Sequence, residues 1–352
     1  METIDVLVVD DSPIIRQILV NMLQSEPGFR VVGQARDGEE AVQLAAHLQP
    51  DVITMDICMP RMDGLQATEQ IMKTTPRPIV VVASSVYDED LHVAFDAVAA
   101  GALTVVEKPK GLSPADYEAV REQLVTTIRL MAEVPVIAVG SEREQAGESH
   151  TEPDVELIAI AASTGGPGVL YQILGALSPI LSIPILIVQQ ITHGFVQGLA
   201  CWLDNVTALE VAVAKENEQI AAGRILIAPE DMHMTVAPGG VVQLDDSPPW
   251  NGARPSATRL FHSVAETYGA AAVGVVLTGA GEDGAEGLAA LQQAGGRVIA
   301  QKEEGCMFFG MPQAALERGI VSQVLSPNEI ALALNRLDRR HKYDKLPKTT
   351  GE

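Results

Sequence analysis

Cysteine, positive charge and long apolar runs are all scarce in this sequence. Its three cysteines, at positions 58, 201 and 306, form no CxxC pair, so we expect neither a disulfide framework nor a cysteine-ligated metal. Lys and Arg together number 24 against 46 Asp and Glu, which gives a formal net charge of −22. A chain this acidic repels DNA and RNA phosphates, and this argues against nucleic-acid binding.

Hydrophobic segments of membrane-spanning length are missing as well. No stretch of the sequence approaches the ~18 uninterrupted apolar residues of such a helix. The first residues, METIDVLVVDD, turn acidic after a short apolar run and carry no basic segment ahead of it, unlike a secretory signal peptide. We therefore expect no direct membrane insertion and a location in the reducing cytoplasm.

What the sequence has instead is an alternation of short β-branched runs with segments of helical spacing. Apolar residues make up 47% of the chain and aromatics only 4%, a balance typical of α/β domains built from Val, Ile, Leu and Ala. Five strands alternate with five helices at the start of the chain, which predicts a doubly wound parallel sheet. The expected strands cover residues 6–9, 31–34, 52–56, 79–83 and 103–107, and the helices 14–24, 38–49, 64–73, 90–100 and 114–132.

A second α/β domain is expected after a polar linker. We place the first domain at 1–130, the linker at 131–154, the second domain at 155–340 and a tail at 341–352. The second domain is predicted to be a Rossmann-like, three-layer parallel-sheet domain, and Pro-Gly-Gly between two short strands predicts an inserted β-hairpin. Its expected strands cover 157–161, 184–189, 224–228, 234–237, 241–244, 272–277 and 297–300, and its helices 167–177, 195–203, 257–268, 284–293, 312–318 and 327–338.

Charged and polar side chains follow the strands of the first domain where those strands end. Asp10 and Asp11 end the first strand and Asp56 ends the third, while Ser84 ends the fourth. Lys108 follows the fifth. Ligands bind at this edge of a parallel sheet, and three converging carboxylates favour a divalent hard cation. Asp56 would then attack a phosphoryl donor. The alternative is that each is an ordinary solvated loop residue.

Residues 4 to about 125 closely resemble the response-regulator receiver domain, through the segments VVDDS, MDICMPRMDG, ASS and KP. The resemblance implies a flavodoxin-like fold, Mg²⁺ as cofactor and a phosphohistidine on a sensor histidine kinase as the phosphoryl donor. It implies Asp56 as phospho-acceptor, Ser84 and Lys108 as switch residues, and Asp10, Asp11, Asp56 and the Cys58 carbonyl as Mg²⁺ ligands.

A serine ends the first strand of the second domain. Ser163 lies in IAASTGGP, between that strand and a helix, where free backbone N–H groups and the positive end of the helix dipole suit an oxyanion of acyl transfer. Gly165 and Gly166 allow a sharp turn and a close substrate approach. A phosphate-binding loop or a plain N-cap serine explains the same residues, and Ala161 replaces the first glycine of the G-x-S-x-G elbow.

A carboxylate follows a later strand in the segment LTGAGEDGAEGL. Asp283 lies between the strand at 272–277 and the next helix, which places it at the same sheet edge as Ser163. There it could orient and stabilise a histidine, as in a Ser-His-Asp triad. A helix N-cap aspartate is the alternative.

The second domain resembles the effector domain of the chemotaxis methylesterases from about Glu156 to about Leu337. The matching segments are IAASTGGP, LIAP with HM after it, ARPSATRLFHSVA, LTGAGEDGAEGL and FFGMPQAA. A receiver joined to this domain is the architecture of the protein-glutamate methylesterase family. The resemblance implies hydrolysis of glutamate γ-methyl esters and deamidation of glutamines on chemoreceptor helices, without a cofactor in this domain. It implies Ser163 as nucleophile, Asp283 as triad acid, and an unphosphorylated receiver that blocks the active site.

The position that matches the family's general base carries a glutamine. The family pattern is Gln-His-Met-Pro-Pro-Gly-Phe, whereas residues 189–195 read QQITHGF, so Gln190 replaces the base and His193 follows three residues later. A glutamine has no titratable proton near neutral pH, and loss of the base costs ~10⁴-fold in rate. Three residues span at most ~10 Å, so a turn would let His193 act as a displaced base. An exposed loop or N-cap histidine is an equal alternative.

Two hypotheses of different class follow. The first is a phosphorylation-activated ester hydrolase with Ser163 as nucleophile, Asp283 as orienting acid and His193 as displaced base. The second is a phospho-gated binding module whose methylesterase domain has lost turnover. A transcriptional regulator is excluded by the acidic charge and by the lack of a basic recognition helix after the linker.

Overall fold

A computed structural model describes residues 3–83, 89–109, 114–132 and 154–338. Contacts divide the chain into two compact units, Met1–Ala146 and Gly147–Glu352, and each unit has its own parallel sheet. The domain and linker boundaries stay predictions, because most of the expected linker and the whole expected tail fall outside the described residues. Among the described helices, none is long and apolar enough to cross a membrane.

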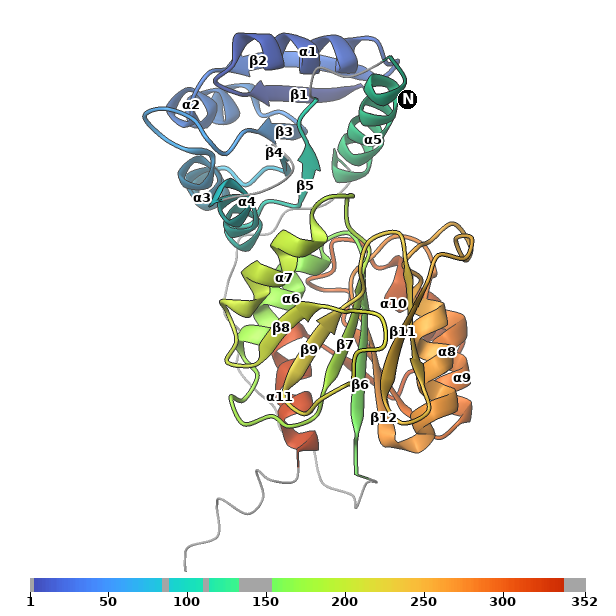
Figure 1. Cartoon of the computed structure of the whole chain (residues 1–352). Coiled ribbons are helices and arrows are strands. Elements are labelled where there is room, and N and C mark those ends of the chain that lie inside the picture. The colour runs from blue at the N-terminus through green and yellow to red at the C-terminus, as the bar shows by residue number, and fades with distance from the viewer. Residues whose placement is uncertain (1–2, 84–88, 110–113, 133–153, 339–352) are drawn as a thin grey trace, which may run out of the picture. The chain divides into compact units, whose positions relative to one another are not determined.

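The first unit is a doubly wound parallel sheet, as predicted. Its strand order is β2-β1-β3-β4-β5, the flavodoxin-like order. Three of its strands are apolar along nearly their whole length, because helices cover both faces of the sheet: α2, α3 and α4 contact one another in series, and α1 contacts α5 (Figure 1). The strands are β1 (Ile4–Val9), β2 (Phe29–Ala35), β3 (Val52–Met55), β4 (Ile79–Ala83) and β5 (Thr104–Glu107), and the helices α1 (Pro13–Gln24), α2 (Gly38–Leu48), α3 (Gly64–Thr74), α4 (Glu89–Ala99) and α5 (Pro114–Ala132).

The second unit contains a seven-stranded parallel sheet with the order β14-β13-β12-β6-β7-β9-β8. The two outermost strands were missed from sequence, since each is short and partly exposed and so has no continuous buried run. The chain runs from β6 to one side of the sheet and returns to place β12 on the other side, which makes β6 the topological switch point. The strands are β6 (Leu157–Ala162), β7 (Ile185–Gln189), β8 (Glu210–Val213), β9 (Arg224–Ile227), β12 (Ala272–Val276), β13 (Arg297–Gln301) and β14 (Gln323–Leu325).

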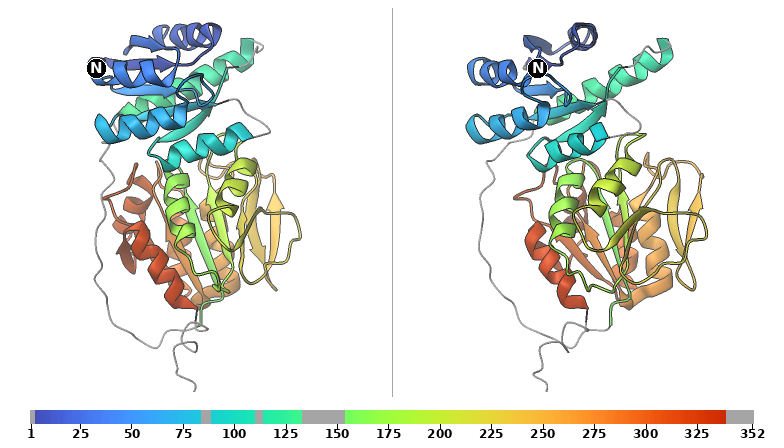
Figure 2. Two further views of the ribbon diagram at one scale, coloured as in Figure 1. Left: turned by 90° about the vertical axis from the view of Figure 1, so that its left-hand side faces the viewer. Right: turned by 60° about the vertical axis from the view of Figure 1, so that its left-hand side comes forward.

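The predicted hairpin and the helix layers complete this unit. Strands β10 (His233–Ala237) and β11 (Val241–Asp245) pair antiparallel, and Gly239 and Gly240 supply the positive φ angles of 88° and 74° that their turn requires. The hairpin packs on α8. Helices α6 (Gly166–Gly175), α7 (Val196–Asp204) and α11 (Pro327–Leu337) cover one face of the sheet, and α8 (Ala257–Tyr268), α9 (Ala285–Gln293) and α10 (Gly310–Glu317) the other (Figure 2).

A close approach of α9 to α8 fixes the position of the loop that follows β12. Gly287 of α9 lies under the backbone carbonyl of Thr258 in α8, where a Cβ atom would collide with that oxygen. The Gly284 N–H also donates to Thr258 Oγ1 at 2.8 Å. The start of α9 is thereby held against the first turn of α8.

We predict that Gly287→Ala destabilises the protein although alanine favours helices. The added methyl group meets rigid backbone, and such overpacking costs about 1–3 kcal/mol, more than the ~1 kcal/mol that alanine gains over glycine in a helix. Gly175→Ala in α6 is the matched control. A Cβ atom added there first meets a side-chain methyl of Val206, at 3.0 Å, rather than rigid backbone. Urea unfolding should show a lower midpoint for Gly287→Ala only. Equal midpoints for the two variants would contradict the close packing.

Candidate functional site

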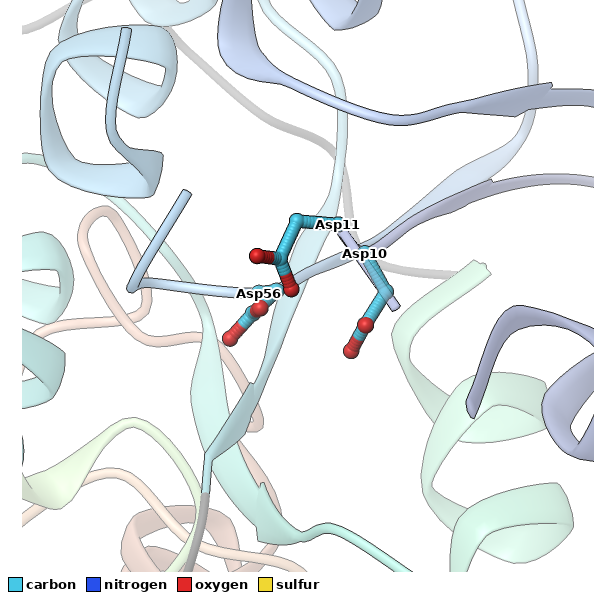
Figure 3. Close-up of side chains that lie close together, drawn as sticks. All are labelled: Asp10, Asp11 and Asp56. Carbon is cyan, nitrogen blue, oxygen red and sulfur yellow. The ribbon is translucent and has the colours of Figure 1, made fainter. Parts of the chain in front are cut away.

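Three carboxylates meet at the carboxyl edge of the first sheet, as the sequence predicts. Asp10 follows β1 and Asp56 follows its neighbour β3, and both are almost completely buried, at 0% and 3% exposure. Asp11 is exposed beside them. One oxygen from each of the three lies within 4.8 Å of the others (Figure 3). Chain segments more than 40 residues apart are thus joined into one acidic pocket.

Lys108 closes this pocket with a positive charge. Its Nζ lies 2.7 Å from Asp56 Oδ1 and 2.9 Å from Asp10 Oδ2. Burial raises the pKa of Asp56 to about 6, an effect that Lys108 opposes and the charges of Asp10 and Asp11 reinforce. Burial by itself would lower the pKa of Lys108, but its bonds to Asp56 and Asp10 outweigh this and raise it. The pocket therefore keeps one fixed positive charge among its acids.

The pocket also has the donor set of a hard divalent cation. Asp56 Oδ2 is buried without a hydrogen-bond partner, and carboxylate oxygens are the ligands that Mg²⁺ prefers. A cation there would satisfy this oxygen and oppose the burial and the repulsion that together raise the pKa of Asp56. Ser84, the other predicted switch residue, lies outside the described residues.

Ser163 follows β6, the switch-point strand of the second sheet, and its backbone is held from both neighbouring strands. Its N–H donates to Thr278 O at 3.0 Å on the β12 side. On the β7 side, Gln189 Nε2 donates to Ser163 O at 2.7 Å. The N-cap of α6 is Gly165, without a side-chain cap, so Ser163 is not the capping residue of this helix. Its hydroxyl is left available for other chemistry.

The Asp283 carboxylate lies against the first turn of α8. Its Oδ1 accepts hydrogen bonds from Ser256 Oγ at 2.9 Å and Thr258 N at 3.0 Å. Its Oδ2 accepts from Ala257 N at 2.7 Å and from Gln190 Nε2 at 2.8 Å. A helix N-terminus with free N–H groups stabilises a negative charge. Four hydrogen bonds therefore hold the Asp283 carboxylate in place. Asp283 does not cap the helix that follows it, because the N-cap of α9 is Gly284.

Gln190 lies beside Asp283, at the position where the family pattern has its general base. His193 lies instead beside Glu230 and Asp231. The His193 side chain is 79% exposed, and its Nδ1 lies 3.3 Å from Glu230 Oε2 and 3.2 Å from Asp231 Oδ2. In the part of the chain that the structure describes, no hydrogen bond or ion pair joins His193 to Ser163 or Asp283. The role of His193 as a displaced base stays a prediction.

The residues that hold Asp283 in place were missed from sequence. Ser256 and His233 are both fully buried. Ser256 N donates to His233 Nδ1 at 3.2 Å, and His233 Nε2 lies 3.2 Å from Pro248 O. Because Nδ1 accepts from Ser256 N, Nε2 is the ring nitrogen that donates to Pro248 O. A serine just ahead of the helix predicted at 257–268 is an N-cap signal, but nothing local to it indicates Asp283 as a partner.

We predict that the raised pKa of Asp56 makes the first domain less stable as pH rises from about 4 to about 6 in Mg²⁺-free buffer. In this window the folded carboxyl keeps a proton that the unfolded chain releases, so folding loses up to about 3 kcal/mol. Asp56→Asn should remove this loss. Urea unfolding of the full chain between pH 4 and pH 7 tests it, with the exposed Glu39→Gln as control. An unchanged pH dependence in Asp56→Asn would contradict the assignment.

Both units match families of known proteins. The model of the response regulator receiver domain matches residues 6–114, and that of the CheB methylesterase matches residues 158–334. The crystal structure of the Thermotoga maritima CheB methylesterase catalytic domain is similar to the second unit, with a TM-score of 0.51 and 36% identity over 52% of this chain and 99% of that chain.

Whole-length relatives carry the two units in one chain. The protein-glutamate methylesterase/protein-glutamine glutaminase 4 of Myxococcus xanthus is 41% identical over 339 residues, which cover 94% of this chain and 95% of that protein. The protein of the same name from Geobacter metallireducens is 42% identical over 342 residues, 95% of this chain and 99% of that protein. Together with the matched domains, these likenesses show that the chain belongs to the CheB family of response regulators, in which a receiver domain is joined to a methylesterase domain.

Proposed function

We propose that a sensor histidine kinase phosphorylates Asp56 and thereby controls the second domain, which hydrolyses glutamate methyl esters and glutamine amides on the cytoplasmic helices of chemoreceptors. The observation that carries this proposal is the position of Ser163 and Asp283 after the neighbouring strands β6 and β12. Relatives with both domains are named for these two activities. Partners of this kind would place the chain in the cytoplasm.

In the receiver domain, an Asp56 oxygen would attack the phosphorus of the kinase phosphohistidine. The carboxyl–phosphate bond forms as the P–N bond breaks and the imidazole leaves. Lys108, 2.7 Å from Asp56 Oδ1, would offset the charge of the acyl phosphate. Mg²⁺ would supply further positive charge to the phosphoryl oxygens, and its proposed ligands are Asp10, Asp11, Asp56 and the Cys58 carbonyl. The switch role of Ser84 stays a prediction.

In the methylesterase domain, Ser163 Oγ would attack the glutamyl side-chain carbonyl. The tetrahedral oxyanion would face the positive end of the α6 dipole, although Gly166 N is already bonded to Ser163 O and Pro167 has no N–H. Methanol or ammonia then leaves with a proton, and water cleaves the acyl-serine to release glutamate. Asp283 would orient and stabilise the group that accepts and returns the serine proton.

The identity of that proton acceptor separates two candidate functions. If His193 is the base, substrate binding has to draw its ring away from Glu230 and Asp231 and toward Ser163. If it stays there, the hydrogen bond from Gln190 to Asp283 leaves the serine without a base, and this observation favours the second candidate. In that candidate the domain binds glutamyl side chains under phosphorylation control without appreciable turnover.

We predict that methanol release from a methylated receptor requires Ser163 and, if the first candidate holds, His193. Release is measured with and without acetyl phosphate as phosphodonor and Mg²⁺. Ser163→Ala should abolish it, and His193→Ala should lower it by ~10²-fold or more, since general-base catalysis contributes that much. His262→Ala is the control, because this half-exposed histidine pairs with Glu286 rather than with Ser163 or Asp283 among the described residues.

Gln190→His completes the experiment by restoring an imidazole beside Asp283. In the second candidate, the natural chain releases no methanol and Gln190→His gains activity by up to ~10⁴-fold over that background. This outcome would reject His193 as the base. Failure of every variant, including Gln190→His with the phosphodonor present, would contradict glutamate methyl esters as the substrate.

A further inference from the structure

We propose that Gln190 makes the methylesterase domain prefer glutamine side chains over glutamate methyl esters. The inference rests on the proposed function, because it assumes that the glutamyl side chain binds at Ser163. It holds whichever group accepts the serine proton, since it concerns the hydrogen-bonding character of Gln190 itself.

The contact with Asp283 fixes which way the Gln190 amide faces. An ionised carboxylate only accepts hydrogen bonds, so the amide nitrogen faces Asp283 Oδ2, at 2.8 Å. Three further donors from Ser256, Ala257 and Thr258 fill the carboxylate and hold it in place. The Gln190 carbonyl oxygen, Oε1, therefore faces away from Asp283.

That oxygen is an open hydrogen-bond acceptor. Gln190 is half-buried, and its Oε1 accepts no hydrogen bond from the residues that the structure describes. The Oε1 atom of the neighbouring Gln189 is buried and has no hydrogen-bond partner, but Gln190 Oε1 is not buried in this way. Gln190 Oε1 consequently meets solvent in the site, while the Gln189 amide is enclosed beneath Gly166.

The leaving group of a bound substrate would come next to this acceptor. The residue that takes the place of the triad base lies between the nucleophile and the leaving group, and Gln190 follows β7, which pairs with the Ser163-bearing strand β6. A glutamine amide presents N–H donors there. A methyl ester presents only oxygen lone pairs and a methyl group, and a glutamate carboxylate adds a charge that the acceptor repels.

A histidine in this position would discriminate less. Neutral imidazole bonded to Asp283 through one nitrogen offers an acceptor, but protonated imidazole offers a donor, so it suits an amide and an ester in turn. The glutamine amide has no second protonation state. The structure thus points to a binding order of glutamine first, methyl ester second and glutamate last.

The test measures binding of a receptor cytoplasmic fragment by isothermal titration calorimetry. The fragment carries glutamine, methylated glutamate or glutamate at one modification site, and the full chain carries Ser163→Ala to prevent turnover, with Mg²⁺ and acetyl phosphate present. The glutamine form should bind about three- to tenfold more tightly than the methyl ester, as expected for one additional neutral hydrogen bond. Gln190→Met should remove this difference mainly by weakening the glutamine form. Gln197→Met, at an exposed position on α7, should keep it.

The outcomes separate this inference from the proposed function. Equal affinities for the glutamine and methyl ester forms in the Ser163→Ala chain would overturn the preference, as would a preference that survives Gln190→Met, while receptor binding would still stand. No binding of any form would overturn the receptor assignment and this inference with it. Equal affinities can already be observed with the Ser163→Ala chain, which keeps Gln190. The test therefore does not depend on the folding of Gln190→Met.

Discussion

The serine site of this protein depends on one half-buried group, the Asp283 carboxylate, and on the hydrogen bonds that it accepts. Close packing of α9 on α8, permitted by Gly287, brings Asp283 to the first turn of α8. There Ser256, Ala257 and Thr258 supply three donors, and the helix dipole adds to their effect. The carboxylate in turn decides the orientation of Gln190, and with it what the site offers to a substrate beside Ser163.

The two domains use the same feature of parallel sheets but manage negative charge differently. In the receiver, buried acids at the strand ends are balanced by Lys108, and Asp56 Oδ2 is left without a partner. Its charge state therefore responds to a proton, a cation or a phosphoryl group. In the methylesterase domain, four neutral donors surround the Asp283 carboxylate and hold it in place. The first arrangement suits a switch and the second a fixed support for binding.

Much of this could be predicted from sequence, because strand ends are readable from local pattern and parallel strands share one edge. The strand ends predicted that Asp10, Asp56 and Lys108 lie together, and the structure confirms their contacts. Partners that depend on packing between distant segments could not be predicted in this way. Ser256 meets Asp283 only because α8 and α9 cross closely, and His193 meets Glu230 across a separation of 37 residues. The edge strands β8 and β14 were missed because a short, half-exposed strand leaves little periodic signal.

Hydrogen exchange of the Gln190 side-chain amide tests the central interaction most directly. It can be followed by NMR on full-length protein labelled with ¹⁵N-glutamine, with the Gln190 signals assigned by their loss in Gln190→His. If Asp283 holds Nε2, one Gln190 amide proton should exchange more slowly than those of the exposed Gln197, and Asp283→Ala should abolish this protection. Equal exchange at Gln190 and Gln197 in the unaltered protein would contradict the account.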